Sequence, residues 1–212
     1  MMLRLISATP SPYARKVRIV LAEKAIPFEL LTEVPWNATT ATPQYNPLEK
    51  LPVLLLEDGG AVYESRFILE WLEAKYPAPP MVPDDIDRRL FARQVEVLAD
   101  GICDALVLVF WERHRAPEHR SQPWIDRQMR KLDGGMRTLA GWAGGRNFVV
   151  GDCFGLADVA TATVCRYLDV RFPDYPWRQT HPKLSEYSDR MELRPSLAGS
   201  VPVPQMISDK VV

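Results

Sequence analysis

The chain has 212 residues, of which 47% are hydrophobic and 25% are charged, and this composition supports a full apolar core in one large or two small domains. Its formal net charge of −1 creates no global field for recruiting nucleic acid or an anionic membrane, so neither is expected as a partner. The three cysteines, Cys103, Cys153 and Cys165, are odd in number and lack C-x-x-C spacing. A disulfide framework is therefore not expected, and a reducing, cytoplasmic location is.

Strand and helix signals alternate over residues 1–76. The strands are predicted at 3–6, 28–34, 53–56 and 61–63, and the helices at 12–25 and from Ser65 onward. Apolar residues recur at helical spacing in the first helix, and an Asp-Gly pair between the last two strands is typical of a hairpin. The order β-α-β-loop-β-β-α requires one parallel crossover and one antiparallel hairpin, so a small mixed sheet is expected.

A proline-rich linker is predicted at residues 77–83, because four prolines within eight residues can continue neither a helix nor a central strand. Residues 84–212 then read as an all-helical domain, with helices predicted at 84–111, 123–142, 156–169 and 183–194. The apolar segment 102–111 is too short to cross a bilayer, and residues 1–10 lack a signal-peptide stretch. Membrane insertion and export are therefore not expected.

The first segment that can carry chemistry is Thr9-Pro10-Ser11, at the turn from the first strand into the first helix. A hydroxyl there lies beside the partial positive charge of a helix N-terminus. It can donate a hydrogen bond to a bound thiolate and lower the thiol pKa by about one to two units. Alternatively, Ser11 only caps the helix, with Pro12 at its first position.

Two further segments are candidates for binding. Pro52 directly precedes a strand, where the X-Pro bond is either cis in a tight turn or, more commonly, trans; the backbone of Leu51 could then pair with an extended peptide as an added strand. Ser65 is predicted to cap a helix whose N-terminus suits a carboxylate, and Glu64 suits an ammonium group. Simple capping also accounts for Ser65.

Metal and phosphate chemistry find no support in the sequence. His114, His119 and His181 show no metal-ligand spacing to one another or to the cysteines. There is no glycine-rich phosphate loop. No metal is therefore expected.

In this order and at these spacings the segments resemble the glutathione S-transferase family, bacterial cytosolic type, over nearly the whole chain. The resemblance rests on residues 11–18, 46–54, 63–65, 100–105, 155–158 and 167–196. It implies a thioredoxin-like N-terminal domain with a mixed four-stranded sheet at 1–76 and an all-helical domain at 84–212. It also implies glutathione as co-substrate and a homodimer. Gly155 departs from the family, which usually has Ser or Thr at this cap.

The resemblance also implies roles for matched positions. Ser11 would stabilise the glutathione thiolate, with Thr9 in reserve. Leu51 would pair its backbone with the cysteinyl unit beside a cis Pro52. The remaining expected contacts are Glu64 and Ser65 to the γ-glutamyl end, Lys50 and Trp36 near the glycyl end, and Tyr13, Phe110, Trp111 and His114 in an electrophile pocket between the domains. These aromatic residues are also good core residues.

The leading hypothesis is an enzyme of detoxification that conjugates glutathione to small hydrophobic electrophiles, with a possible peroxidase side activity that uses the same thiolate. The alternative is a non-catalytic binding or interaction module that keeps the fold. A disulfide reductase is opposed by Ser11, because serine stands where some relatives carry cysteine and cannot form a mixed disulfide.

Overall fold

The computed structural model describes residues 2–212 of the chain, and its contacts divide them into two compact units. Unit 1 comprises residues 2–81 together with 194–211, and unit 2 comprises residues 82–193. The sequence predicted a helical domain that extends to residue 212, and the C-terminal limit of that domain needs correction. Residues 194–211 return to unit 1.

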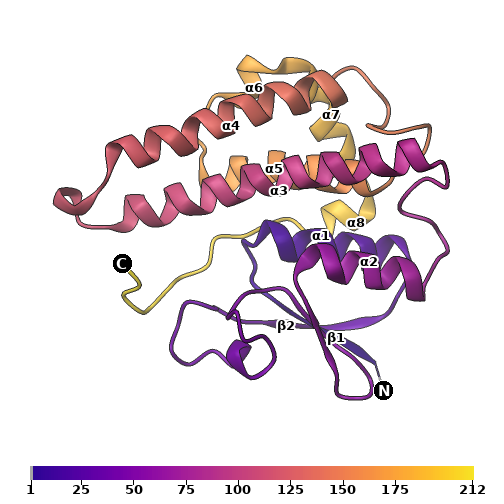
Figure 1. The fold of residues 1–212 in the computed structure, drawn as a ribbon, viewed down its shortest axis with the longest axis horizontal. Coiled ribbons are helices and arrows are strands. Elements are labelled where there is room, and N and C mark those ends of the chain that lie inside the picture. Colours follow the sequence, from indigo (N-terminus) through magenta and orange to yellow (C-terminus); the bar gives the residue numbers. More distant parts are fainter. Residues whose placement is uncertain (1) are drawn as a thin grey trace. The chain divides into compact units, whose positions relative to one another are not determined.

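Unit 1 is built on a four-stranded mixed sheet, as predicted (Figure 1). Its strands are β1 (Leu3–Ser7), β2 (Phe28–Thr32), β3 (Val53–Leu55) and β4 (Ala61–Tyr63). The spatial order is β2-β1-β3-β4; β1 runs parallel to β2 and antiparallel to β3, and β3 runs antiparallel to β4. The parallel pair is connected by a helix and the last pair by a hairpin, which is the thioredoxin-like arrangement.

The helices of unit 1 are α1 (Pro12–Glu23), α2 (Ser65–Lys75) and α8 (Pro195–Ala198), with a short 3-10 turn η1 (Thr42–Gln44). Helix α1 packs against both α2 and α8. The turn η1 and the short helix α8 were not predicted, because neither is long enough to show a hydrophobic period.

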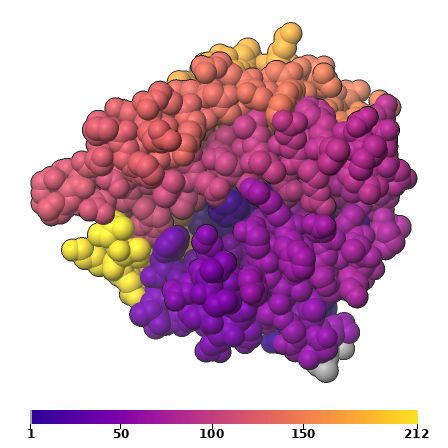
Figure 2. Space-filling view, in the orientation of Figure 1, coloured from indigo at the N-terminus to yellow at the C-terminus, as the bar shows by residue number. Residues whose placement is uncertain are grey.

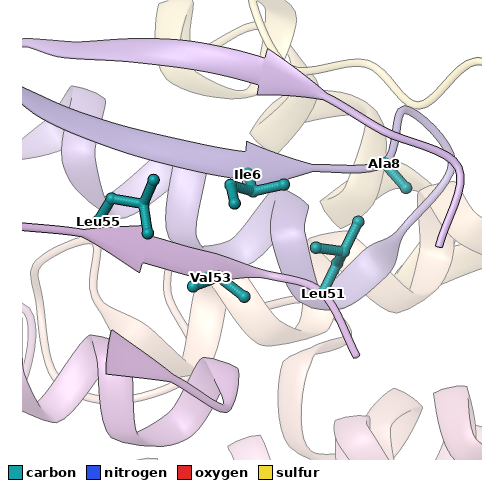
Figure 3. Close-up of a cluster of buried hydrophobic side chains, with 5 residues drawn as sticks. All are labelled: Ile6, Ala8, Leu51, Val53 and Leu55. Atoms are coloured by element: carbon teal, nitrogen blue, oxygen red, sulfur yellow. The ribbon is translucent and has the colours of Figure 1, made fainter. Parts of the chain in front are cut away.

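A compact apolar cluster fixes β1 against β3. It consists of the buried side chains Ile6, Ala8, Leu51, Val53 and Leu55 (Figure 3). Fully burying an aliphatic side chain of this size contributes about 1.5–3 kcal/mol. Leu51 precedes β3 and belongs to this cluster, so its side chain anchors a backbone that lies outside the ladder.

Side chains of α1 hold the C-terminal segment in unit 1. Arg15 is buried at 2% exposure and donates from Nε to the Ser200 carbonyl at 3.1 Å and from a terminal nitrogen to the Leu197 carbonyl at 3.2 Å. Glu23, at the end of α1, forms an ion pair with Arg194 at 2.8 Å. Because the segment 194–200 pairs with these two charged side chains, it packs with unit 1 and does not extend the last predicted helix.

Unit 2 is all-helical, as predicted. Its helices are α3 (Ile86–His114), α4 (Gln122–Ala143), α5 (Leu156–Arg171), α6 (Trp177–Thr180) and α7 (Pro182–Glu192), with a 3-10 turn η2 (Pro117–His119). Helix α3 packs against α4 and α5, and α7 packs against α4, α5 and α6. The four long helices match the prediction within three residues, whereas α6 and η2 were not predicted. Helix α3 continues to His114, so Arg113 and His114 are helical.

Asp158 organises the start of α5. Its buried carboxylate accepts hydrogen bonds from the backbone N–H groups of Val149 at 2.8 Å and Gly155 at 2.9 Å, and from the Tyr187 hydroxyl. Burial raises the pKa of Asp158 even though these bonds favour the charged form. Gly155 supplies the cap geometry without a side-chain acceptor, so Asp158 provides the reciprocal bond of this helix start.

Candidate functional site

Ser11 lies at the N-terminus of α1, as predicted. It is the N-cap residue, and its Oγ accepts a hydrogen bond from the Ala14 N–H at 3.2 Å, with Pro12 at the first helical position. Capping uses the oxygen as an acceptor and leaves the hydroxyl proton available. Within residues 2–212 that proton has no acceptor, so Ser11 can cap the helix and still donate to a ligand.

Thr9 is engaged differently. Its hydroxyl donates to the carbonyl of Val203 at 2.9 Å, and the Val203 N–H donates back to the Thr9 carbonyl at 3.3 Å. The Thr9 proton is therefore already used to attach the C-terminal segment. Of the two hydroxyls considered from the sequence, only that of Ser11 is free to donate in this structure.

The segment before β3 presents an unpaired backbone. The Leu51–Pro52 peptide bond is cis, as the resemblance implied. The Lys50 carbonyl accepts from the Asn46 side chain at 2.8 Å, while the backbone groups of Leu51 bond to no group in the described part of the chain. A free N–H and C=O beside a strand are the features that pair with an extended peptide. The Lys50 side chain is exposed.

Glu64, not Ser65, caps α2, which corrects the sequence prediction. The Glu64 carboxylate accepts from the Arg66 N–H at 3.3 Å, and Ser65 is the first helical residue. The reason is the turn out of β4, which places Glu64 at a φ of 70°, a left-handed conformation that costs a non-glycine residue about 1–3 kcal/mol.

Ser65 nevertheless remains at the helix N-terminus that the sequence indicated. Its side chain is buried at 1% exposure, and its hydroxyl donates to Glu64 Oε1 at 3.3 Å. Its backbone N–H has no acceptor among residues 2–212. A free N–H in the first turn of a helix is suited to binding a carboxylate.

Trp36 lies in the loop that follows β2, and its side chain is 44% exposed. Two sets of bonds order this loop. Within it, the Glu33 carboxylate accepts from the Ala41 N–H at 3.0 Å and from the Thr42 hydroxyl at 3.1 Å. The second set comes from the C-terminal segment.

Residues 203–209 run along this loop, and Figure 2 shows the yellow C-terminal residues beside the violet ones of the N-terminal part. Gln205 donates to the Glu33 carbonyl at 3.0 Å, the Ser208 N–H donates to Asn37 Oδ1 at 3.1 Å, and the Ala38 N–H donates to Asp209 at 2.6 Å. Sequence reasoning missed these residues because nothing local in the sequence links segments more than 160 positions apart.

The remaining candidates are aromatic. Tyr13 lies half-buried on α1 of unit 1. On α3 of unit 2, the Phe110 ring contacts the rings of Trp111 at 5.3 Å and His114 at 4.1 Å between centroids. His114 Nδ1 lies 2.7 Å from the Phe110 carbonyl; because a carbonyl only accepts, Nδ1 carries the proton. The three α3 rings thus form one cluster.

Two arginines that were not expected in the site contact aromatic rings at the C-terminal ends of α3 and α5. The Arg171 guanidinium lies 4.6 Å from the Phe110 ring centroid, and that of Arg113 lies 5.4 Å from the centroid of Phe172. Burial raises the pKa of Tyr167, which lies one turn before Arg171 on α5. The C-terminal ends of α3 and α5 are therefore joined by reciprocal cation–π contacts.

Residues 2–212 contain no group of three or more His, Cys, Asp or Glu side chains placed to hold a metal ion. Over the same residues, no helix combines the length and apolarity that spanning a bilayer requires.

Comparison with known proteins places this arrangement in a family. The family model for the glutathione S-transferase N-terminal domain matches residues 10–75, and the model for the C-terminal domain matches residues 122–190. The uncharacterised GST-like protein YibF of Escherichia coli is 34% identical over 200 residues, covering 94% of this chain and 98% of YibF.

Two solved structures are similar over nearly the full length. A glutathione S-transferase from Methylobacterium radiotolerans, in complex with glutathione sulfonate, is 60% identical with a TM-score of 0.98 and full coverage of both chains. A glutathione transferase family member from Pseudomonas fluorescens, with bound S-(propanoic acid)-glutathione, is 34% identical with a TM-score of 0.82, covering 95% of this chain and 100% of that one. The chain belongs to the glutathione S-transferase family.

Proposed function

We propose that the protein is a glutathione transferase that binds glutathione on unit 1 and adds its thiolate to small hydrophobic electrophiles. The observation that carries the proposal is a set of unused hydrogen-bonding groups in one unit. The Ser11 hydroxyl proton, the Leu51 backbone and the Ser65 backbone N–H all lack partners within residues 2–212. Polar groups left unpaired at partly buried positions favour a polar ligand that satisfies them.

Each part of glutathione has a complementary group. The γ-glutamyl carboxylate binds the free N–H of Ser65, where the α2 dipole favours negative charge. Its ammonium group pairs with the Glu64 carboxylate. The cysteinyl backbone pairs with Leu51 beside Pro52, as an added strand. The glycyl carboxylate lies near the Lys50 ammonium group, with Trp36 beside it.

The thiolate is stabilised by the Ser11 hydroxyl and by the N-terminus of α1. The thiol releases its proton to solvent, and the sulfur then attacks an electrophilic carbon, forming a C–S bond while a leaving group departs or a neighbouring carbon takes up a proton. The protein's contribution is to position the sulfur and to lower its pKa. We assign acceptor binding to Phe110, Trp111 and His114; a contribution from Tyr13 stays a prediction.

The ligands of the two relatives support this reaction class. Glutathione sulfonate carries the tripeptide scaffold, and S-(propanoic acid)-glutathione is a conjugate in which the sulfur already bears a carbon substituent. We propose in addition that the conjugating enzyme is a cytoplasmic homodimer that takes part in detoxification. Reduction of organic hydroperoxides would use the same thiolate and is proposed as a side activity.

The first experiment is an ultraviolet titration of the thiol of glutathione in the presence of saturating protein. We expect the thiol pKa of bound glutathione to be at least about one unit below that of free glutathione. Ser11→Ala should remove most of the pKa shift, leaving the part due to the N-terminus of α1, and reduce kcat/KM by about 10–100-fold. Because Ser11 also caps α1, Ser11→Gly, which costs a cap only a few tenths of a kcal/mol, separates the lost hydroxyl from lost folding.

The second candidate is a non-catalytic module, and family membership alone is compatible with it because a fold hosts many functions. Bound glutathione with an unshifted thiol, or no binding, would support this candidate and contradict the proposal. Sedimentation at micromolar concentration tests the homodimer separately, because a monomer would contradict the predicted homodimer and leave the proposed reaction intact.

A further inference from the structure

Two positive charges in unit 2 have no matching negative charge. Within residues 2–212, neither Arg113 nor Arg171 forms an ion pair with a carboxylate. The nearby Asp169 is already used, because it pairs with Arg166 at 3.5 Å and with Arg178 at 2.6 Å. Arg113 and Arg171 instead rest on aromatic rings, which leaves their N–H groups without a charged acceptor.

The surroundings of Arg171 single it out. Its Nε is buried and donates to no acceptor in the described part of the chain, and its guanidinium lies over the Phe110 ring, 4.6 Å from the ring centroid. The helix macrodipoles favour cations at the ends of α3 and α5, but they do not satisfy those N–H groups. A planar guanidinium fixed in this way is organised to bind a carboxylate.

From this geometry we propose that the acceptor substrate is an aromatic or similarly flat acid whose carboxylate binds Arg171, with Arg113 adding long-range attraction. The rings of Phe110, Trp111 and His114 supply the apolar surface for the rest of the acceptor. This inference rests on the proposed function and narrows it, since general hydrophobic electrophiles need no cation. Arg171 is the specificity-determining residue in this reading.

The test compares two acceptors that differ only in charge, a chloronitrobenzoate and the corresponding chloronitrobenzamide. In both, the thiolate sulfur bonds to the ring carbon that bears chlorine, the C–Cl bond breaks and chloride leaves. We expect the wild-type protein to favour the acid in kcat/KM and Arg171→Gln to lower the acid-to-amide ratio about tenfold or more. Arg171→Lys, which keeps the charge but not the planar fork, should restore part of the ratio.

Arg130→Gln is the matched control, because Arg130 is an exposed arginine of unit 2 and its loss changes the net charge equally. It should leave the ratio unchanged. An equal fall of the acid-to-amide ratio in Arg130→Gln would overturn the assignment of carboxylate binding to Arg171. An unchanged ratio in Arg171→Gln would overturn it as well.

A binding measurement separates this inference from the proposed function. Calorimetry with the unreactive pair nitrobenzoate and nitrobenzamide should give tighter binding of the acid to the wild-type protein, and this preference should be lost in Arg171→Gln. If no acceptor is turned over yet the preference holds, conjugation fails and the acid site stands. If the amide is conjugated but the acid binds no better, the acid site fails and the transferase stands.

Discussion

At the residue scale, the two hydroxyls next to α1 differ in whether the hydroxyl proton is still free to donate a hydrogen bond. Ser11 uses only its oxygen, whereas Thr9 uses its proton to bond the Val203 carbonyl. Sequence alone cannot separate them, because both lie in the turn between strand and helix. The distinction requires a partner that lies 194 positions away along the chain.

Thr9→Val therefore makes a sharp counterpart to the Ser11 variants. The change keeps the shape of the side chain and removes one partly exposed hydrogen bond, so we expect the free energy of unfolding to fall by about 0.5–1.5 kcal/mol. The thiol pKa of bound glutathione should stay at the wild-type value. Urea unfolding and the ultraviolet titration measure the two effects, and a raised thiol pKa in Thr9→Val would transfer the activating role from Ser11 to Thr9.

At the element scale, adjacent glycines in α4 face different surroundings. A Cβ on Gly135 would lie 2.5 Å from Ile102 Cγ1 of α3, whereas a Cβ on Gly134 meets nothing within 4 Å. Gly135 thus allows α3 and α4 to approach closely. Gly134 makes no such contact, and its effect is to give the unfolded chain more conformational freedom. The two glycines are adjacent in the sequence, and nothing in their immediate neighbours reveals this difference.

We expect Gly134→Ala to stabilise the protein by about 0.5–1 kcal/mol, because alanine restricts the unfolded chain and favours a helix. Gly135→Ala should instead destabilise it by about 1–3 kcal/mol through overpacking. Urea unfolding followed by circular dichroism compares the pair. Ile102→Val removes the terminal Cδ1 and should recover part of the loss in the Gly135→Ala background; equal effects of the two alanines would contradict the close approach.

Most elements and their order followed from the sequence because they depend on local signals. The hairpin at Asp58-Gly59, the period of α1 and the long helices of unit 2 are each contained within one segment. The misses are non-local: the cap of α2 depends on the turn that leaves β4 at Glu64, and the acid-binding proposal depends on Arg171 meeting Phe110 across two helices. The buried Arg15 reads locally as a surface charge on a helix.

At the scale of the whole molecule, unit 1 is discontinuous in sequence. The chain leaves unit 1 after residue 81 and re-enters it at residue 194. The buried Arg15 and the ion pair of Glu23 bind the segment that re-enters. Burial alone would raise the pKa of Glu23, but hydrogen bonds from Arg194 and Ser196 lower it overall. This contribution to stability is therefore full above the usual glutamate pKa and is lost as the pH falls through the lowered value.

The end of the chain connects this returning segment to the proposed glutathione site. Removing residues 205–212 deletes the three bonds from Gln205, Ser208 and Asp209 to the loop that carries Trp36, while the internal bonds of Glu33 and the bonds between Thr9 and Val203 remain. The loop must then be ordered at the expense of binding, so we expect the KM for glutathione to rise about 3–10-fold. The kcat should change less, because Ser11 and its cap are not touched.

Asp209→Ala should reproduce part of this rise in KM, since it removes a single bond to the Ala38 N–H. Met206→Ala is the matched control: Met206 is 85% exposed, and its side chain lies in the same segment without ordering the loop. Steady-state kinetics with varied glutathione distinguish the outcomes. A truncated protein with an unchanged KM would mean that the loop orders itself and that the C-terminal segment serves only the stability of unit 1. A graded rise in KM from Asp209→Ala to the truncation would make the last eight residues part of the glutathione-binding surface.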